Sequence, residues 1–330
     1  MIARQEVRDT TNPRTWNPWH GCRRCSEGCE NCYMFFLDEM RGVPENSDTV
    51  SRTKEFDLPL QKDRKGRYKV PSGLMLSINM TSDTFIEDAD PWRDEMWSII
   101  RKRPDVIFYI LTKRVGRIRG CLPEDWGDGY ENVILSITCE TQRAFDERWP
   151  VFERIPAKHK QLNLAPMISP VDVFPAVASG QIEQVNLSGE GFGGRRPCRY
   201  EWIEAVSRAC EENRVNLIVN YVGSVFYKDG ARYELETLQE QGRWAYRSGL
   251  GRFFGRPRYN LYSPYDRHLL TDDEIGSPVY NSHMCRECVN RPVCYGCLDC
   301  GGCKQVSLVD ADWNPVETAP SVRTLDDFLE

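Results

Sequence analysis

The stretch PWRDEMWSIIRKRPDVIFYIL, residues 91–111, contains a predicted helix followed at once by a predicted strand. Pro91 suits the first turn of a helix. The run VIFYIL, residues 106–111, is apolar and rich in branched and aromatic residues, as is typical of a strand that is buried on both faces. The apolar residues that fall on one side of the helix are Trp92, Met96, Ile99 and Ile100.

The same strand pattern recurs along the chain and predicts an α/β fold. Further helical patterns lie at 145–155, where Pro150 is expected to break or restart the helix, and at 200–213. Alternating helices and strands predict a partial (β/α) barrel of parallel strands, with its chemistry at the carboxyl ends of the strands. The further strand runs are LMLSIN (74–79), VILSIT (133–138), QLNLAP (161–166), QVNLSG (184–189) and NLIVNYV (216–222).

Two segments depart from the pattern of alternating strands and helices. Residues 41–73, before the first of these runs, are polar and predict an irregular insertion. Residues 226–268, after the last run, interleave aromatic residues with arginines. We therefore predict a barrel domain at 1–224 and an aromatic, arginine-rich and cysteine-rich extension at 225–330. The aromatic belt at 226–268 could wall a reaction site, stack the bases of a single strand, or pack the tail onto the barrel.

The number and clustering of the cysteines favour metal binding over disulfide bonds. The 330 residues include 14 cysteines, which cluster at 22–32 and 285–303. Neither a signal peptide nor a membrane span is apparent, so we expect a cytoplasmic protein whose cysteines are reduced. The net charge of −6 argues against a protein that binds nucleic acid mainly through a basic surface.

Cys22, Cys25, Cys29 and Cys32 lie within eleven residues. The spacing Cys25-x3-Cys29-x2-Cys32 resembles the loop of radical S-adenosylmethionine (SAM) enzymes, in which three thiolates hold a [4Fe–4S] cluster and the fourth iron binds SAM. Cys22-x6-Cys29-x2-Cys32 is a second candidate triad. All four cysteines together could close a cluster or hold zinc.

Six ordered motifs across residues 12–222 resemble a phage and bacterial family of unknown function that is related to radical SAM proteins. This resemblance implies a partial barrel, SAM as cofactor and a cluster at Cys22, Cys29 and Cys32. Cys25 replaces the family's usual aliphatic residue, and His20 replaces a common threonine. The motifs are WNPWHGC…SEGCENCY, SINMTSDTFIED (77–88), FYILTKRVGRI (108–118), NVILSITCET (132–141), LAPMISPVD (164–172) and NLSGEGFGGRRP (186–197).

The resemblance implies SAM contacts at the strand ends. Polar strand ends and helix caps are the alternative interpretation for all of these residues. GEGFGG fits a dinucleotide fingerprint, but no apolar helix follows it, so we reject that interpretation. The predicted contacts are Asn79, Thr81, Ser82 and Asp83 for the amino group, Lys113 and Arg114 for the carboxylate, Ser136, Thr138 and Glu140 for the ribose, and Ser188, Gly189 and Glu190 beside the cofactor.

The second cysteine cluster resembles the SPASM extension of radical SAM enzymes, with one residue missing from the last spacer. The last four cysteines of this cluster have the repeated CxxC spacing of ferredoxin ligands, so one or two auxiliary [4Fe–4S] clusters are expected. A zinc ribbon is the alternative. The ligands would be Cys285, Cys288, Cys294, Cys297, Cys300 and Cys303.

These features predict a radical SAM enzyme, which would reductively cleave SAM to a 5′-deoxyadenosyl radical that abstracts hydrogen from a substrate. The electron would come from a donor such as flavodoxin or ferredoxin. The SPASM-like tail favours a peptide or amino-acid-derived substrate, and the belt favours a nucleoside or nucleic acid. The rival hypothesis is a non-enzymatic, zinc-stapled protein that binds single-stranded nucleic acid.

Overall fold

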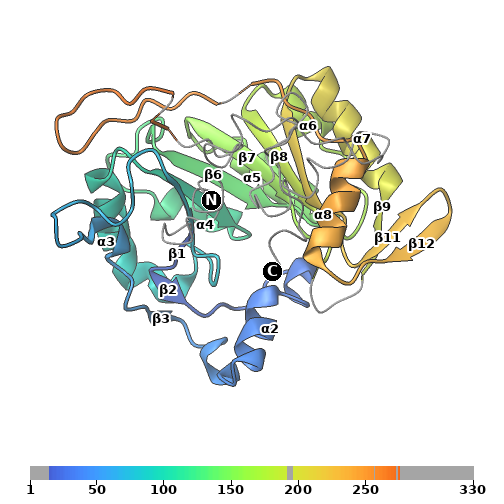
Figure 1. Cartoon of the computed structure of the whole chain (residues 1–330), viewed down its shortest axis with the longest axis horizontal. Coiled ribbons are helices and arrows are strands. Elements are labelled where there is room, and N and C mark those ends of the chain that lie inside the picture. The colour runs from blue at the N-terminus through green and yellow to red at the C-terminus, as the bar shows by residue number, and fades with distance from the viewer. Residues whose placement is uncertain (1–14, 192–195, 256, 273, 276–330) are drawn as a thin grey trace, which may run out of the picture.

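The computed structural model describes residues 15–191, 196–255, 257–272 and 274–275. Its centre is a curled half-barrel of seven parallel strands in the order β1-β4-β5-β6-β7-β8-β10 (Figure 1). The predicted α/β class and partial barrel are confirmed. The strands are β1 (Thr15–Trp16), β4 (Met75–Ile78), β5 (Ile107–Thr112), β6 (Val133–Thr138), β7 (His159–Leu164), β8 (Ile182–Ser188) and β10 (Asn216–Tyr221).

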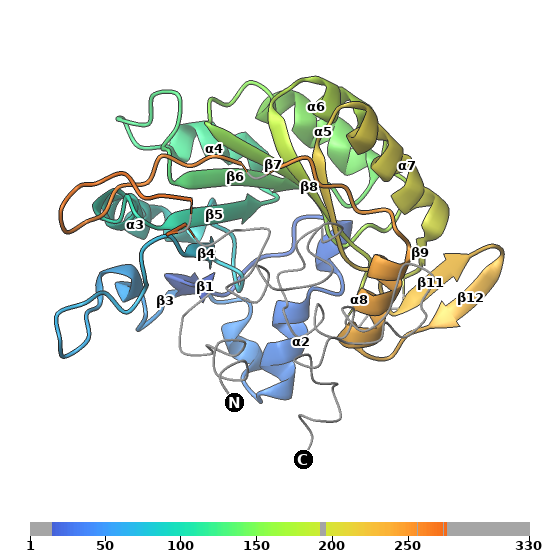
Figure 2. The same cartoon turned by 45° about the horizontal axis from the view of Figure 1, so that its top comes forward.

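Helices cover the convex face of this sheet, as Figure 2 shows. Alternate strand residues face them, so Phe108 of β5 belongs to the same buried apolar cluster as Met96 and Ile100 of α3. Each such side chain stabilises the fold by about 1.5–3 kcal/mol on burial. Within the described ranges, no helix is both long and apolar enough to cross a membrane. The covering helices are α3 (Asp90–Lys102), α4 (Val115–Cys121), α5 (Gln142–Phe152), α6 (Phe174–Ala178) and α7 (Tyr200–Glu212).

Two details of the helices differ from the predictions. Pro150 lies inside α5, which continues to Phe152, so the expected break at this proline is wrong. A proline this close to the end of a helix removes only one of the last backbone hydrogen bonds. Trp97 was missed as a core residue. It is fully buried, and its indole donates a hydrogen bond to the carbonyl of Cys121 at 2.9 Å.

The predicted irregular insertion at 41–73 contains only short elements. These are η2 (Pro44–Asn46), η3 (Leu58–Leu60) and β3 (Ser51–Arg52), which pairs antiparallel with β2 (Trp19–His20). Arg103, directly after α3, attaches the insertion to the barrel, because its guanidinium donates to the carbonyls of Pro59 and Val70. The buried Asp105 balances this charge at 2.8 Å.

Three elements follow β10 and lie beside its edge of the sheet. Strand β11 (Val225–Lys228) forms a hairpin with β12 (Ala231–Glu234) and also pairs in parallel with β9 (Cys198–Arg199). Helix α8 (Leu238–Arg247) packs against β10. This part of the predicted belt is therefore joined to β9 by backbone pairing and to β10 by the packing of α8.

Residues 250–275, here called the strap, cross the amino ends of the strands. Arg252 exchanges backbone hydrogen bonds with Leu217 at the start of β10, and the backbone of Tyr262 bonds to Pro104 ahead of β5 at 3.2 Å. Tyr259 of the strap packs against the His159 ring at 4.4 Å. Since the predicted chemistry lies at the opposite ends of the strands, the strap packs on the half-barrel and does not wall that site.

Candidate functional site

Residues 21–32, here called the cysteine loop, lie at the carboxyl ends of the strands, and Glu140 after β6 holds the middle of this loop. The carboxylate of Glu140 accepts hydrogen bonds from the Gly28 amide at 3.3 Å and from Arg148 at 2.7 Å. Burial opposes its charge, but Arg148 outweighs burial and lowers the pKa of Glu140. A side chain at position 28 would lie 3.1 Å from this carboxyl carbon, which explains the glycine.

Glu190, after β8, is the second anchor of the loop. Its carboxylate accepts hydrogen bonds from the Asn31 amide at 3.2 Å and from the Arg196 side chain at 3.0 Å. Arg196 also donates to the carbonyl of Glu27 at 2.9 Å. A buried carboxylate and one arginine thereby attach both sides of the turn η1 (Glu27–Cys29) to the half-barrel.

Thr81 and Ser82, after β4, hold the first residue of the loop. The Gly21 amide donates to the Thr81 carbonyl at 3.2 Å, and the Ser82 hydroxyl donates to the Gly21 carbonyl at 2.5 Å. The next amide, that of Cys22, donates to the carbonyl of Ser47 at 2.8 Å. In this conformation Thr81 and Ser82 are committed to the loop backbone.

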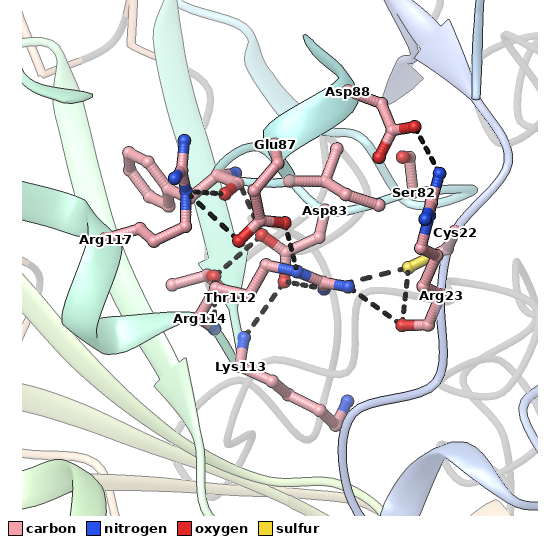
Figure 3. A network of polar contacts seen from close by, with 12 residues as sticks. Cys22, Arg23, Ser82, Asp83, Glu87, Asp88, Thr112, Lys113, Arg114 and Arg117 are labelled. Carbon is pink, nitrogen blue, oxygen red and sulfur yellow. Dashed lines mark hydrogen bonds and ion pairs between the residues drawn. The ribbon is translucent and has the colours of Figure 1, made fainter. Parts of the chain in front are cut away.

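Asp83 organises the end of β5, as Figure 3 shows. One oxygen of its carboxylate accepts from the Phe85 amide at 2.9 Å and from the Thr112 hydroxyl at 2.8 Å. The other oxygen accepts from the Lys113 amide at 3.1 Å and pairs with Arg114 at 3.2 Å. Asp83 is therefore saturated by protein groups, and it fixes the backbone from which Lys113 extends.

Arg114 is likewise engaged. Its guanidinium lies 3.9 Å from the Cys22 sulfur and donates to the Arg23 carbonyl at 2.8 Å, in addition to its pair with Asp83 (Figure 3). Although burial opposes the charge, Asp83 and Cys22 raise the pKa of Arg114. Arg114 thus connects the end of β5 to the first cysteine.

Lys113 is the cation that this network leaves unpaired. Its side chain extends away from Asp83 in Figure 3, and its ammonium has no hydrogen bond or ion pair to any residue in the described ranges. Burial opposes the charged form, but Cys29 and Glu140 raise the pKa of Lys113. A half-buried cation that lies beside thiols and has no partner among the described residues suits an anionic group.

The four thiols of the loop differ in environment. Cys29 is buried and Cys25 is exposed, while Cys22 and Cys32 are half-buried. The neighbouring Cys25 thiol, with Lys113, lowers the pKa of Cys29 to about 4, whereas burial raises the pKa of Cys22 to about 11. No three His, Cys, Asp or Glu side chains converge on a single metal ion in the part of the chain that the structure describes. The six predicted ligands at 285–303 lie outside that part.

Four other predicted contact residues lie at the ends of β4, β6 and β8. Asn79 adopts a left-handed conformation, with φ of 53°, and donates to the Thr84 hydroxyl at 3.0 Å. The side-chain amide oxygen of Asn79 and the hydroxyls of Ser136 and Thr138 are buried without a partner among the described residues. Ser188 accepts a weak hydrogen bond from Asn220 at 3.4 Å.

One family model matches residues 9–247, and its description is "Protein of unknown function (DUF5131)". The chain belongs to the DUF5131 family. The match covers all of the predicted motif region, so the resemblance to a family of unknown function is confirmed. No curated protein and no solved structure matches the chain.

Packing between two strand ends of the DUF5131 half-barrel explains why residue 189 is glycine. A side chain at this position would place its first carbon 2.2 Å from the Val222 carbonyl oxygen, and the Gly189 amide already donates to the Tyr221 carbonyl at 2.9 Å. Gly189 does not have a positive φ. Close approach between the ends of β8 and β10 is therefore sufficient to require glycine here.

Gly189→Ala is expected to separate these two strand ends and to destabilise the protein by about 1–3 kcal/mol, as overpacking does. Chemical denaturation would measure the loss. Gly116→Ala is the matched control, because no atom lies within 4 Å of a side chain added there and its φ is not positive. Equal losses for the two variants would contradict the packing explanation.

Sequence reasoning missed two contributors to the site. Arg196 follows the GEGFGG segment, and nothing in that segment indicates that the arginine returns to Glu190. His20, whose role was open, bonds to the buried Asp38 at 2.9 Å and so attaches α2 (Tyr33–Met40) to the start of the cysteine loop.

Proposed function

We propose that this DUF5131 protein is a radical SAM enzyme. The observation that carries the proposal is the position of the cysteine loop, which Glu140 and Glu190 hold over the carboxyl ends of the strands. Lys113 lies beside the loop and has no partner in the described part of the chain. Chemistry in barrels of parallel strands concentrates at this edge. The family match itself names no function.

The residues present fit a [4Fe–4S] cluster. Cys22, Cys29 and Cys32 would be its ligands, and the nearby positive charges of Lys113 and Arg114 would stabilise thiolates. Such a cluster, when reduced by a donor such as flavodoxin or ferredoxin, supplies the electron that splits SAM into methionine and a 5′-deoxyadenosyl radical.

The unpartnered groups around the loop fit SAM. Lys113 offers a cation to the carboxylate, and the side-chain amide oxygen of Asn79 is a buried acceptor for the amino group. Thr138 lies two residues before Glu140, and its hydroxyl, which has no partner among the described residues, would bind the ribose. Glu140, Glu190 and Asp83, predicted as direct contacts, would act by positioning the cysteine loop and Lys113.

Removal of the Lys113 charge is expected to weaken SAM binding. A hydrogen bond to a charged group contributes about 1.5–3 kcal/mol, so Lys113→Met should raise the KM for SAM by about 10- to 100-fold. Lys113→Arg should recover part of this loss. Lys158→Met, at an exposed ion pair with Glu131 near the amino ends, is the control and should leave the KM unchanged.

The proposed function is tested by anaerobic reconstitution with iron and sulfide, reduction with dithionite and addition of SAM. The expected result is 5′-deoxyadenosine together with a changed EPR signal of the cluster. A protein that takes up zinc but neither iron nor sulfide, and forms no 5′-deoxyadenosine, would refute the proposal. It would point to the zinc-stapled, non-enzymatic alternative.

A further inference from the structure

Six uncharged polar side chains form two rungs across the middle of the sheet. The strand registers align Ser136 of β6, Gln161 of β7 and Gln184 of β8 in one rung. The next rung toward the carboxyl ends consists of Thr138, Asn163 and Asn186. We call this set the polar ladder.

The polar ladder faces away from the helices. Strand residues that alternate with it, such as Leu135, Leu162 and Val185, belong to the apolar cluster that packs under the helices. Because side chains alternate between the two faces of a strand, the ladder lies on the concave face, in front of which Figure 2 shows α2. Parallel strands are usually apolar on both faces, so a polar concave face needs an explanation.

Internal hydrogen bonds satisfy only part of the ladder. Gln184 donates to Asn186 at 2.8 Å, and Asn186 donates to Gln161 at 3.0 Å. Every ladder residue is at most 8% exposed. Asn163 donates to the Tyr109 hydroxyl at 3.4 Å. Even so, four side-chain oxygens have no partner among the described residues: those of Ser136, Thr138, Asn163 and Gln184. The Thr138 hydroxyl is assigned above to the SAM ribose, so the other three are left for a further ligand.

Buried polar groups without partners are unfavourable unless a ligand or ordered water completes them. The ladder begins directly below the cysteine loop, because Glu140, two residues after Thr138, binds the Gly28 amide. The ladder contains no charge. Its amides and hydroxyls present both donors and acceptors.

We propose that the polar ladder binds the substrate of this site, and that the bound part of the substrate is an uncharged edge with adjacent N–H and C=O groups. This edge occurs in nucleobases and in peptide carboxamides. The inference rests on the proposed function only for the statement that this ligand is the substrate. A charged group would leave its charge buried without a partner on the ladder.

The test uses the full-length reconstituted chain with excess SAM, so that nucleosides do not enter the cofactor site. Saturation-transfer NMR would compare guanosine and cytidine, N-acetylasparagine amide, and glutamate as an anionic control. We expect a neutral probe to bind, and Asn163→Leu and Gln184→Met to reduce its signal at least about tenfold, in line with loss of a specific hydrogen bond. Asn260→Leu, the same change at an exposed position on the strap, should bind normally.

A nucleobase and a peptide carboxamide, the two possible sources of the uncharged edge, give different results in this test. Binding of nucleosides alone identifies a base, and binding of the carboxamide alone identifies a peptide. Absence of binding by every neutral probe, or equal binding of glutamate, would overturn the inference. If 5′-deoxyadenosine forms but no neutral probe binds, only this inference fails, whereas neutral binding without 5′-deoxyadenosine refutes only the proposed function.

Stability gives a second, independent readout. If the ladder is incomplete without its ligand, Asn163→Leu should raise the thermal midpoint of the ligand-free protein by about 2 °C, because an unsatisfied buried oxygen is removed and only the 3.4 Å bond to Tyr109 is lost. Gln184→Met does not serve here, because it would also remove the donor to Asn186. A lower midpoint for Asn163→Leu would mean that the ladder serves the fold, and it would overturn the inference.

Discussion

Cys29→Ala is expected to abolish both cluster assembly and 5′-deoxyadenosine formation, with a loss of activity of more than about 100-fold. Even mutation of a residue that only hydrogen-bonds to a metal ligand typically costs about 10- to 100-fold. Cys29 is common to both candidate triads and is the buried thiol of the loop, with a pKa lowered to about 4. Iron content, the EPR signal and product would be measured together. Cys121→Ala, at the end of α4, is the control.

The two candidate triads are separated by Cys22→Ala and Cys25→Ala. Backbone hydrogen bonds from the loop tie Cys22 to Ser47, Cys29 to Ser26 and Cys32 to Cys29. Cys25 is exposed and has no such bond among the described residues. We therefore expect Cys22→Ala to lose activity as Cys29→Ala does, and Cys25→Ala to retain it. The reverse result would assign the cluster to Cys25, Cys29 and Cys32.

Asp105→Ala is expected to destabilise the protein by about 3–5 kcal/mol, the effect of removing one partner of a buried ion pair. Arg103 and Asp105 are both fully buried and pair at 2.8 Å, and Asp105 also accepts from the Ser72 hydroxyl at 2.7 Å. Without Asp105 the guanidinium stays buried without a counter-charge. Urea denaturation would measure the loss.

A double variant distinguishes the loss of the ion pair itself from the cost of leaving one charge buried alone. Arg103→Met combined with Asp105→Ala removes both charges, so its loss should be smaller than the sum of the two single losses. Asp125→Ala breaks the exposed pair with Arg101 and should cost less than about 1 kcal/mol. Additive single losses would show that Asp105 acts through Ser72 and packing alone.

The sequence by itself determined the architecture. Strands such as β5 and helices such as α3 can be predicted because burial of one or both faces imposes a periodic pattern of apolar residues. Alternating strands and helices then allow only a few sheet topologies. The ordered motifs across residues 12–222 are also local, and they placed the chain correctly in a family of unknown function. The polar residues at the strand ends were located by the same reasoning, since parallel strands bring these ends to one edge.

Only the tertiary structure decided what those polar residues contact. Glu190 meets Arg196 and Asn31, and Asp83 meets Arg114, while Lys113 next to it has no partner among the described residues. No local pattern distinguishes a lysine that pairs from one that does not, because hydrogen bonding and charge pairing depend on distances between residues far apart in the chain. The polar ladder has the same origin: its six side chains become neighbours only through the register of three strands.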